Sequence, residues 1–126
     1  MINILLVDDE RAMLNSLADG LRSSGEDWNI LTAENGKQGA EILDSYRVDI
    51  VVTDLRMPGM DGYELLAYVR KKRPDIPVIV MTADCMPAVE DRVFPLGASQ
   101  CVKKPFHLAE MVNNIASHLT GPQDYV

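Results

Sequence analysis

Residues 49–54 read Asp49-Ile50-Val51-Val52-Thr53-Asp54. The middle of this stretch is continuously apolar and β-branched, and residues 78–81 repeat the pattern as Val78-Ile79-Val80-Met81. Strands that are covered on both faces have such unbroken apolar runs, whereas a strand with one wet face alternates apolar and polar residues. The two stretches therefore predict internal strands of a parallel sheet, at residues 49–53 and 78–81.

The rest of the chain alternates between strand and helix patterns. Shorter apolar runs predict further strands at residues 2–7, 29–33 and 101–103, and amphipathic stretches lie between and after the strands. The clearest helical stripe is formed by Leu108, Met111, Val112, Ile115 and Leu119. Pro95 removes a backbone donor late in the fourth helical stretch, so we expect that helix to be short or to end near Phe94. Five strand and helix pairs predict a doubly wound α/β domain whose ligands bind beyond the carboxyl ends of the strands.

Length and charge restrict the function further. The chain has 126 residues, which suits one domain, predicted over residues 1–120, followed by a tail or the start of a linker at 121–126. Its net charge of −7 opposes direct binding to nucleic acid. No stretch approaches the roughly 18 consecutive apolar residues of a membrane span. Acids follow the apolar run at residues 2–7 at once, which indicates a first strand and not a signal peptide, and we expect a cytoplasmic protein.

Polar residues follow the predicted strands. Asp8 and Asp9 come after the first, Asp54 after the third, Thr82 after the fourth and Lys104 after the fifth. In a parallel sheet these ends converge on one rim. Three carboxylates close together raise one another's pKa unless a cation shares the site, so a hard divalent ion is implied. Mg²⁺, or Mn²⁺ in its place, suits carboxylate ligands and leaves positions open for phosphate oxygens.

A carboxylate beside Mg²⁺ and a lysine ammonium is arranged to attack a phosphoryl group, because both cations neutralise charge on its oxygens. Asp54 is central enough to be that nucleophile, with Lys104 as the ammonium. Thr82 offers a hydroxyl to a phosphate oxygen, which would draw its loop inward and couple the chemistry to shape.

Each residue also has a simpler interpretation. Asp8 and Asp9 before a helix could be an N-cap, and Asp54 could cap a turn. Thr82 could be an ordinary strand residue, and Lys104 a solvated surface charge. The position of all of them at carboxyl ends of parallel strands favours a shared site.

Five segments carry a resemblance to a known family. They are Leu5-Leu6-Val7-Asp8-Asp9-Glu10, Asp54-Leu55-Arg56-Met57-Pro58-Gly59-Met60-Asp61-Gly62, Met81-Thr82-Ala83, Gly97-Ala98 and Lys104-Pro105-Phe106. In order and spacing they resemble the receiver domains of bacterial response regulators, from residue 2 to about 119. The resemblance implies a flavodoxin-like fold with strand order 2-1-3-4-5.

The resemblance also implies a mechanism. Asp54 would take a phosphoryl group from the phosphohistidine of a sensor histidine kinase or a phosphotransfer protein and would later lose it by hydrolysis. Asp9, Asp54 and the backbone carbonyl of Arg56 would bind Mg²⁺, with Asp8 acting through a water. Lys104 would pair with the phosphoryl group and precede Pro105 through a cis peptide. The chain would be a signalling domain and not an enzyme on external substrates.

The resemblance implies a switch as well. Its modulating residues would be Thr82, Ala83, Asp84, Cys101 and Pro105. A downstream effector or a covalent output domain would read the switch, and phosphorylation could drive a homodimer through the fourth helix, fifth strand and fifth helix.

Cys101 departs from the family pattern, because it stands where most receivers have an inward-swinging Tyr or Phe. It and Cys85 match no metal-ligand spacing, and we interpret both as small packing residues without a redox role. With the aromatic residue absent, we expect phosphorylation to shift residues 82–87 more than strand five.

Arg56 and Asp84 each lie two residues beyond a site residue and should overhang Asp54. They could form an exposed ion pair that screens the attacking water, or they could be two solvated charges.

Two other functions remain as alternatives. A phosphorylation-independent receiver that only binds proteins would need none of Asp9, Asp54, Thr82 and Lys104, yet all four are present. A Mg²⁺-dependent phosphohydrolase with an aspartate nucleophile would need a second acid beside Asp54 and a substrate-covering cap, which Leu55-Arg56 and a short chain do not provide.

Overall fold

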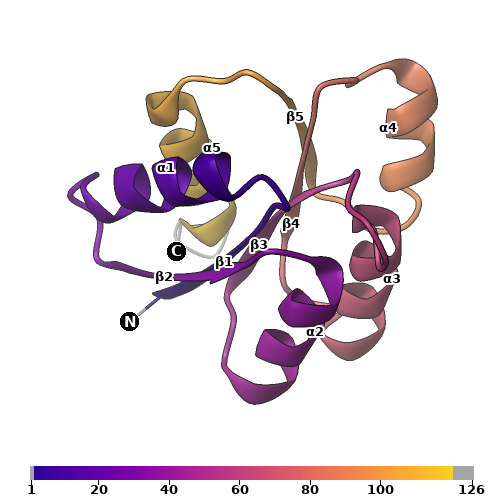
Figure 1. The fold of residues 1–126 in the computed structure, drawn as a ribbon, viewed down its shortest axis with the longest axis horizontal. Helices are drawn as coiled ribbons and strands as arrows, with labels where there is room; N and C mark the ends of the chain where they lie inside the picture. The colour runs from indigo at the N-terminus through magenta and orange to yellow at the C-terminus, as the bar shows by residue number, and fades with distance from the viewer. Residues whose placement is uncertain (1, 121–126) are drawn as a thin grey trace.

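The computed structural model describes residues 2–120, and the predicted tail or linker at 121–126 lies outside the described residues. A single parallel sheet crosses the molecule in the strand order β2-β1-β3-β4-β5 (Figure 1). The strands are β1 Ile2–Val7, β2 Trp28–Ala33, β3 Ile50–Asp54, β4 Val78–Thr82 and β5 Gln100–Lys103. The helices are α1 Arg11–Arg22, α2 Gly36–Ser45, α3 Gly62–Lys72, α4 Pro87–Val93 and α5 Leu108–Thr120. The predicted fold class and strand order are confirmed.

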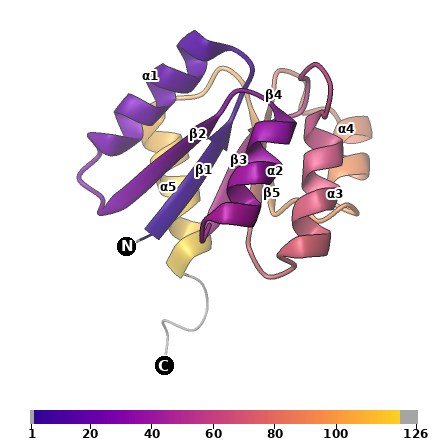
Figure 2. The ribbon, with the colours of Figure 1, turned by 60° about the horizontal axis from the view of Figure 1, so that its bottom comes forward.

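The sheet is covered on both faces, as its unbroken apolar runs predict. Side chains alternate between the faces along a strand, so Leu5 and Val7 of β1 join one core while Ile4 and Leu6 join the other. The first core is closed by α2 and α3, through residues such as Leu43. The second core is closed by α1 and α5. Figure 2 shows the sheet between the two helix layers.

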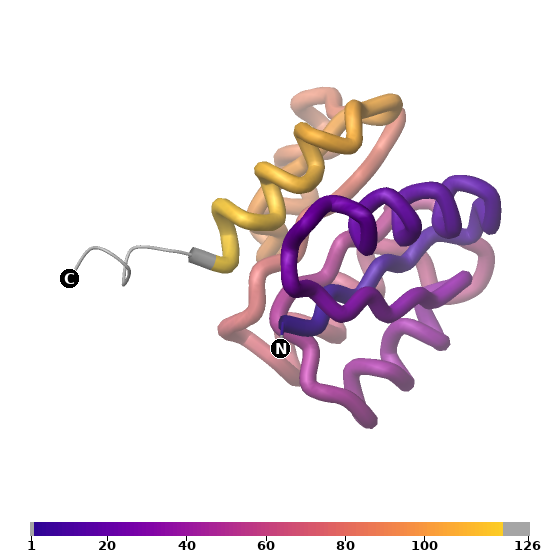
Figure 3. The backbone as a smooth tube through the Cα atoms, turned by 90° about the vertical axis from the view of Figure 1, so that its left-hand side faces the viewer, coloured from indigo at the N-terminus to yellow at the C-terminus, as the bar shows by residue number. Residues whose placement is uncertain are grey.

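The α5 stripe behaves largely as its spacing predicts. Met111 and Ile115 are fully buried in the core that α5 shares with α1, and Val112 and Leu119 pack at its edge. Figure 3 shows α1 and α5 side by side on this face, and the two helices are in contact. Leu108, the first residue of the stripe, stays 42% exposed. Among the helices that the structure describes, none has the length and apolar character needed to cross a membrane.

Two strands end one residue later than the sequence predicts. Asp54 pairs with Met81 in the ladder between β3 and β4, and Thr82 pairs with Lys103 in the ladder between β4 and β5. Asp54 and Thr82 are therefore the last residues of their strands and do not follow them. Backbone pairing with the neighbouring strand continues past the apolar runs, through Thr53 to Asp54 in β3 and to Thr82 in β4, which side-chain polarity alone does not reveal. The prediction of a short α4 is confirmed, since it ends at Val93 with Phe94 as its C-cap.

The start of α3 holds the loop after β3 in place. The Asp61 side chain caps the helix by accepting a hydrogen bond from the backbone N–H of Glu64 at 2.9 Å. The next residue, Gly62, donates its backbone N–H to the carbonyl of Leu55 at 2.9 Å. A Cβ on Gly62 would overlap the carbonyl oxygen of Asp54 and lie 2.5 Å from the Cα of Leu55. Only glycine therefore allows the helix to approach the end of β3 this closely.

We expect Gly62→Ala to lower the free energy of unfolding by about 1 to 3 kcal/mol, because the new methyl group meets backbone atoms that cannot rotate away. Urea unfolding measures this change through the transition midpoint. Gly20→Ala is the matched control in another helix. Its Cβ would meet only the side chain of Leu108, which is half exposed and free to turn. That variant should be neutral or more stable, by up to about 1 kcal/mol from helix propensity. Equal destabilisation by both variants would contradict the close-approach explanation.

Candidate functional site

The predicted site residues converge at the carboxyl end of the sheet. One pocket there is lined by Asp9, Glu10, Asp54, Arg56, Thr82, Ala83, Asp84 and Lys104. These residues come from the ends of β1, β3 and β4 and from the turn after β5, which the strand order brings together. The interpretation of Lys104 as a solvated surface charge is wrong, because its side chain is only 12% exposed.

Lys104 joins two of the acids. Its Nζ lies 2.9 Å from Oδ2 of Asp8 and 3.1 Å from Oδ2 of Asp54. A third carboxylate, that of Glu10, lies 4.0 Å away at Oε1. The backbone N–H of Lys104 also bonds to the carbonyl of Thr82 at 2.8 Å, which fixes the turn after β5 against the end of β4. The peptide bond between Lys104 and Pro105 is cis, as the family resemblance implies.

The charges of this cluster do not balance. Burial raises the pKa of the Asp8 carboxyl above its ordinary value, although hydrogen bonds from Glu10 and Lys104 act in the opposite direction. For Lys104, burial acts to lower the pKa, but hydrogen bonds to Asp8 and Asp54 outweigh it and the pKa is raised. A simple ion pair would lower the carboxyl pKa while raising that of the ammonium. The pKa of Asp8 is raised mainly because the group is buried, and the imbalance itself is visible in the contacts, where one ammonium faces the three carboxylates of Asp8, Glu10 and Asp54.

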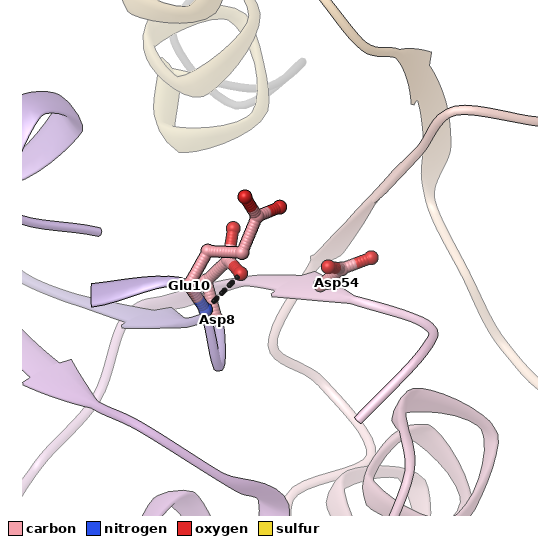
Figure 4. Close-up of side chains that lie close together, drawn as sticks. All are labelled: Asp8, Glu10 and Asp54. Carbon is pink, nitrogen blue, oxygen red and sulfur yellow. Dashed lines mark hydrogen bonds between the residues drawn. The ribbon is translucent and has the colours of Figure 1, made fainter. Parts of the chain in front are cut away.

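The donor set fits a divalent cation. Oxygen atoms of Asp8, Glu10 and Asp54 all lie within 4.8 Å of one another (Figure 4). Hard cations such as Mg²⁺ prefer carboxylate oxygens, and an added double positive charge would relieve the imbalance at Asp8.

The observed carboxylate group differs in one member from the predicted one. Sequence reasoning named Asp8, Asp9 and Asp54, whereas the structure groups Asp8 and Asp54 with Glu10. Asp9 lines the same pocket with an exposed side chain. Glu10 was missed although it directly follows the acid pair. Its backbone N–H donates to Oδ1 of Asp8 at 3.0 Å, drawn as a dashed line in Figure 4, and this tight turn brings the Glu10 side chain back over the site.

The same turn decides against the capping interpretation of the acid pair. The N-cap residue of α1 is Glu10, and the helix begins at Arg11. Asp8 is buried and directed at Lys104, so neither Asp8 nor Asp9 occupies the N-cap position.

Asp54 is held in a defined orientation at the centre of the site. Its Oδ1 accepts the backbone N–H of Leu55 at 2.7 Å, and its Oδ2 accepts the ammonium of Lys104 at 3.1 Å. The residue is 8% exposed, and that exposed part opens into the pocket. The carboxylate is thus fixed from both sides and still reachable, which is the arrangement that a nucleophile requires.

Thr82 and the residues after it form the wall of the pocket on the β4 side. The Thr82 hydroxyl is buried and accepts the backbone N–H of Asp84 at 3.2 Å. Ala83 between them is exposed. Within the described part of the chain this hydroxyl bonds to its own loop, so a shift of Thr82 would draw Asp84 along with it.

Arg56 and Asp84 form the predicted ion pair across the mouth of the pocket. Nη2 of Arg56 lies 2.9 Å from Oδ2 of Asp84, and the two side chains are 82% and 47% exposed. The alternative of two separate solvated charges is therefore wrong. An exposed pair of this kind contributes about 0 to 1 kcal/mol, so its importance lies in its position and not in stability.

Cys101 lies on β5 opposite Val80, half buried against the core. Its sulfur is 3.0 Å from the sulfur of Cys85, in the loop before α4. Both cysteines are free thiols. Sequence reasoning treated them as separate packing residues, and their separation of 16 positions gave no signal of the contact.

Comparison with known proteins agrees with the geometry. The sequence profile of the response regulator receiver domain matches residues 4–116. The chain is 41% identical over 97 residues to the transcriptional regulatory protein GlrR of Escherichia coli (strain K12), covering 73% of this chain and 21% of that protein. It is 36% identical over 119 residues to the heme response regulator HssR of Staphylococcus aureus (strain MRSA252), covering 94% of this chain and 52% of that protein.

The chain therefore spans about half the length of HssR and about a fifth of the length of GlrR. Its fold is similar to the crystal structure of a CheY-like response regulator receiver domain protein from Methanospirillum hungatei JF-1, with a TM-score of 0.91 and 24% identity, covering 100% of this chain and 99% of that one. Sequence profile, relatives and fold agree, and the chain belongs to the response regulator receiver domain family of two-component systems.

Proposed function

We propose that this receiver domain takes a phosphoryl group from a phosphohistidine onto Asp54 in the presence of Mg²⁺ or Mn²⁺, and that the resulting change of shape controls a partner or an output domain. The donor is a sensor histidine kinase or a histidine phosphotransfer protein. The observation that carries the proposal is the fixed carboxylate of Asp54, which lies 3.1 Å from the Lys104 ammonium and within 4.8 Å of two further carboxylates.

In the transfer step, a carboxylate oxygen of Asp54 forms a bond to phosphorus while the bond between phosphorus and the donor imidazole nitrogen breaks. The imidazole keeps the electron pair and takes up a proton. Lys104 stays close enough to pair with the phosphoryl oxygens, because its ammonium already contacts Asp54. The metal, when bound, neutralises negative charge on the phosphoryl oxygens. Asp9, Asp54 and the backbone carbonyl of Arg56 would hold it, with Asp8 acting through a water.

The switch begins at Thr82. In the unphosphorylated state its hydroxyl accepts the backbone N–H of Asp84. The same hydroxyl can donate its proton to a phosphoryl oxygen on Asp54, and as Thr82 shifts toward that oxygen the adjoining loop of Ala83 and Asp84 moves with it. Cys101 and Pro105 flank this motion on the β5 side. The change alters the surface made by α4, β5 and α5, and a partner or a second copy of the chain binds there.

The output lies outside these residues. The relatives GlrR and HssR are named as a transcriptional regulatory protein and a response regulator, and each extends well beyond the matched part. A net charge of −7 opposes direct binding of this domain to nucleic acid. Any contact with nucleic acid would therefore be made by an attached domain or a separate effector. The domain acts in the cytoplasm, changes only its own phosphorylation state, and is not an enzyme on external substrates.

The first prediction is a single phosphoryl adduct in the intact mass after incubation with acetyl phosphate and Mg²⁺. Asp54→Asn should abolish the adduct, because the amide lacks a nucleophilic oxygen, and removal of the metal should do the same. Asp75→Asn, a change at an exposed acid in the turn before β4, is the control that should leave the adduct intact. Absence of an adduct, even with a phosphohistidine donor protein, would favour a receiver that binds partners without phosphorylation.

The second prediction concerns the ligands of the metal. Asp9→Asn should weaken Mg²⁺ binding by at least about tenfold, as does the loss of a metal ligand or of a residue that holds a ligand in place. Glu10→Gln should have a smaller effect. Isothermal titration calorimetry of the unphosphorylated protein measures both affinities, with Asp75→Asn as the control. The reverse order of effects would replace Asp9 by Glu10 in the proposed ligand set, in agreement with the carboxylate group of Figure 4.

The third prediction concerns the lifetime of the phosphorylated form. Asp84→Ala removes the ion pair with Arg56 at the pocket mouth and should speed hydrolysis by up to about fivefold, since water reaches the acyl phosphate more freely. The decay of the phosphoryl adduct by mass spectrometry measures the rate. Asp19→Ala breaks a comparable exposed ion pair with Arg22 in α1 and serves as the control. Equal rates in all three proteins would show that the pair does not screen the site.

A further inference from the structure

The two thiols of the chain are in contact beside the switch loop. Cys85 lies in residues 83–86, which join β4 to α4, and Cys101 lies in β5. Their sulfur atoms are 3.0 Å apart, and both side chains are partly buried. A disulfide bond is about 2.05 Å long, so a shift of about 1 Å would join them. Cys85 stands outside regular secondary structure, where side-chain rotation and a small loop adjustment can supply that shift.

The surroundings of the two sulfurs differ. Cys101 is anchored in the β5 ladder opposite Val80 and packs against the core. Cys85 is flanked by the exposed Met86 on the loop. Burial raises the pKa of the Cys101 thiol to about 12, with its contact to Cys85 adding to the effect. Cys85 lies in a loop outside regular secondary structure, whereas Cys101 is held in the β5 ladder, so we assign the first reaction with an external oxidant to Cys85.

We propose that Cys85 and Cys101 form a reversible disulfide, which ties residues 83–86 to β5 and opposes the phosphorylated state. The second half of this inference rests on the proposed function. In compartments with a reducing thiol pool, the few disulfides that form are usually transient and catalytic or redox-sensing, and a thiol contact in the loop that follows Thr82 fits the sensing use.

The oxidant is a low-molecular-weight disulfide such as glutathione disulfide. The Cys85 thiol loses its proton and attacks one sulfur of the oxidant, and the released glutathione sulfur takes up a proton, leaving a mixed disulfide on Cys85. Cys101 loses its proton and attacks the Cys85 sulfur, forming the internal bond and releasing the second glutathione thiol. Two cysteine thiols are oxidised, and one external disulfide is reduced to two thiols.

The effect on the switch follows from the path of the loop. Thr82 is the last residue of β4, and Cys85 comes three residues later in the same loop, with its sulfur 4.0 Å from the carbonyl oxygen of Thr82. Movement of Thr82 toward a phosphoryl group on Asp54 has to carry this loop along. A bond from Cys85 to a fixed strand holds the loop where it now lies, where the Thr82 hydroxyl bonds to Asp84. The disulfide and the phosphorylated state therefore exclude each other in part.

The first test needs no phosphorylation. The full chain is reduced, incubated with glutathione disulfide and measured by intact mass and peptide mapping. We expect the loss of two hydrogen atoms and a cross-linked peptide pair containing Cys85 and Cys101, reversed by dithiothreitol. Cys85→Ala and Cys101→Ala should each prevent the internal bond. A stable glutathione adduct, a disulfide-linked dimer, or no oxidation of the unaltered protein would overturn the proposal.

The second test measures the effect on the loop and on phosphorylation. Amide exchange in the oxidised protein should show greater protection at residues 83–86 than in the reduced protein, and unchanged protection there would refute the tether. The acetyl phosphate adduct should form at least about fivefold less in the oxidised protein, within the usual range of coupling between sites. The Cys85→Ala/Cys101→Ala double variant should give equal yields with and without oxidant.

The outcomes separate the two proposals. An equal adduct yield in oxidised and reduced protein would overturn the opposition between disulfide and phosphorylation. If the reduced protein forms no adduct either, the proposed function fails, and the disulfide is then judged on mass and exchange alone.

Discussion

The contact of one buried ammonium with two buried carboxylates is the constraint around which the rest of the molecule is arranged. Lys104 reaches Asp8 across 96 positions of the chain and Asp54 across 50. These residues meet only after β1, β3 and β5 have taken their places in one sheet. Burial of charge is costly unless each charge is paired, and here three carboxylates, those of Asp8, Glu10 and Asp54, surround one ammonium. The fold therefore holds a site with an excess of negative charge, which favours the binding of a cation.

The apolar strands and the polar rim are two consequences of the same topology. A parallel sheet covered on both faces has no wet surface along its strands, so polar groups that must reach solvent collect where the strands end. Asp54 and Thr82 are each the last residue of a strand. Thr82 directly follows its apolar run, and only Thr53 separates Asp54 from the run before it. Their backbones are fixed by the ladder while their side chains face the pocket. Gly62 completes this support from the other side, because α3 can lie against the carbonyl of Asp54 only without a side chain there.

Much of the fold and of the site could be predicted from the sequence, because both depend on the periodicity of apolar residues and on the order of the strands. Runs such as Val78-Ile79-Val80-Met81 indicate buried strands, and the strand order then brings Asp8, Asp54 and Lys104 together before any distance is known. What could not be predicted depends on local geometry. Glu10 joins the carboxylate group only because of a turn at Asp8, and the contact of Cys85 with Cys101 depends on the path of a loop. Neither feature leaves a pattern in the order of residue types.

The position of Cys101 connects these points. Most receivers have an aromatic residue there, whose movement accompanies that of the threonine, and a small half-buried thiol cannot fill the same space. The structure instead places a second thiol against it from the loop that follows Thr82. In this chain the loop and β5 therefore meet through two sulfur atoms and not through an aromatic ring. A packing contact between thiols is weak and lets the loop move, whereas a covalent bond does not. The same pair of residues can thus permit or restrain the motion of one loop, depending only on whether two hydrogen atoms are present.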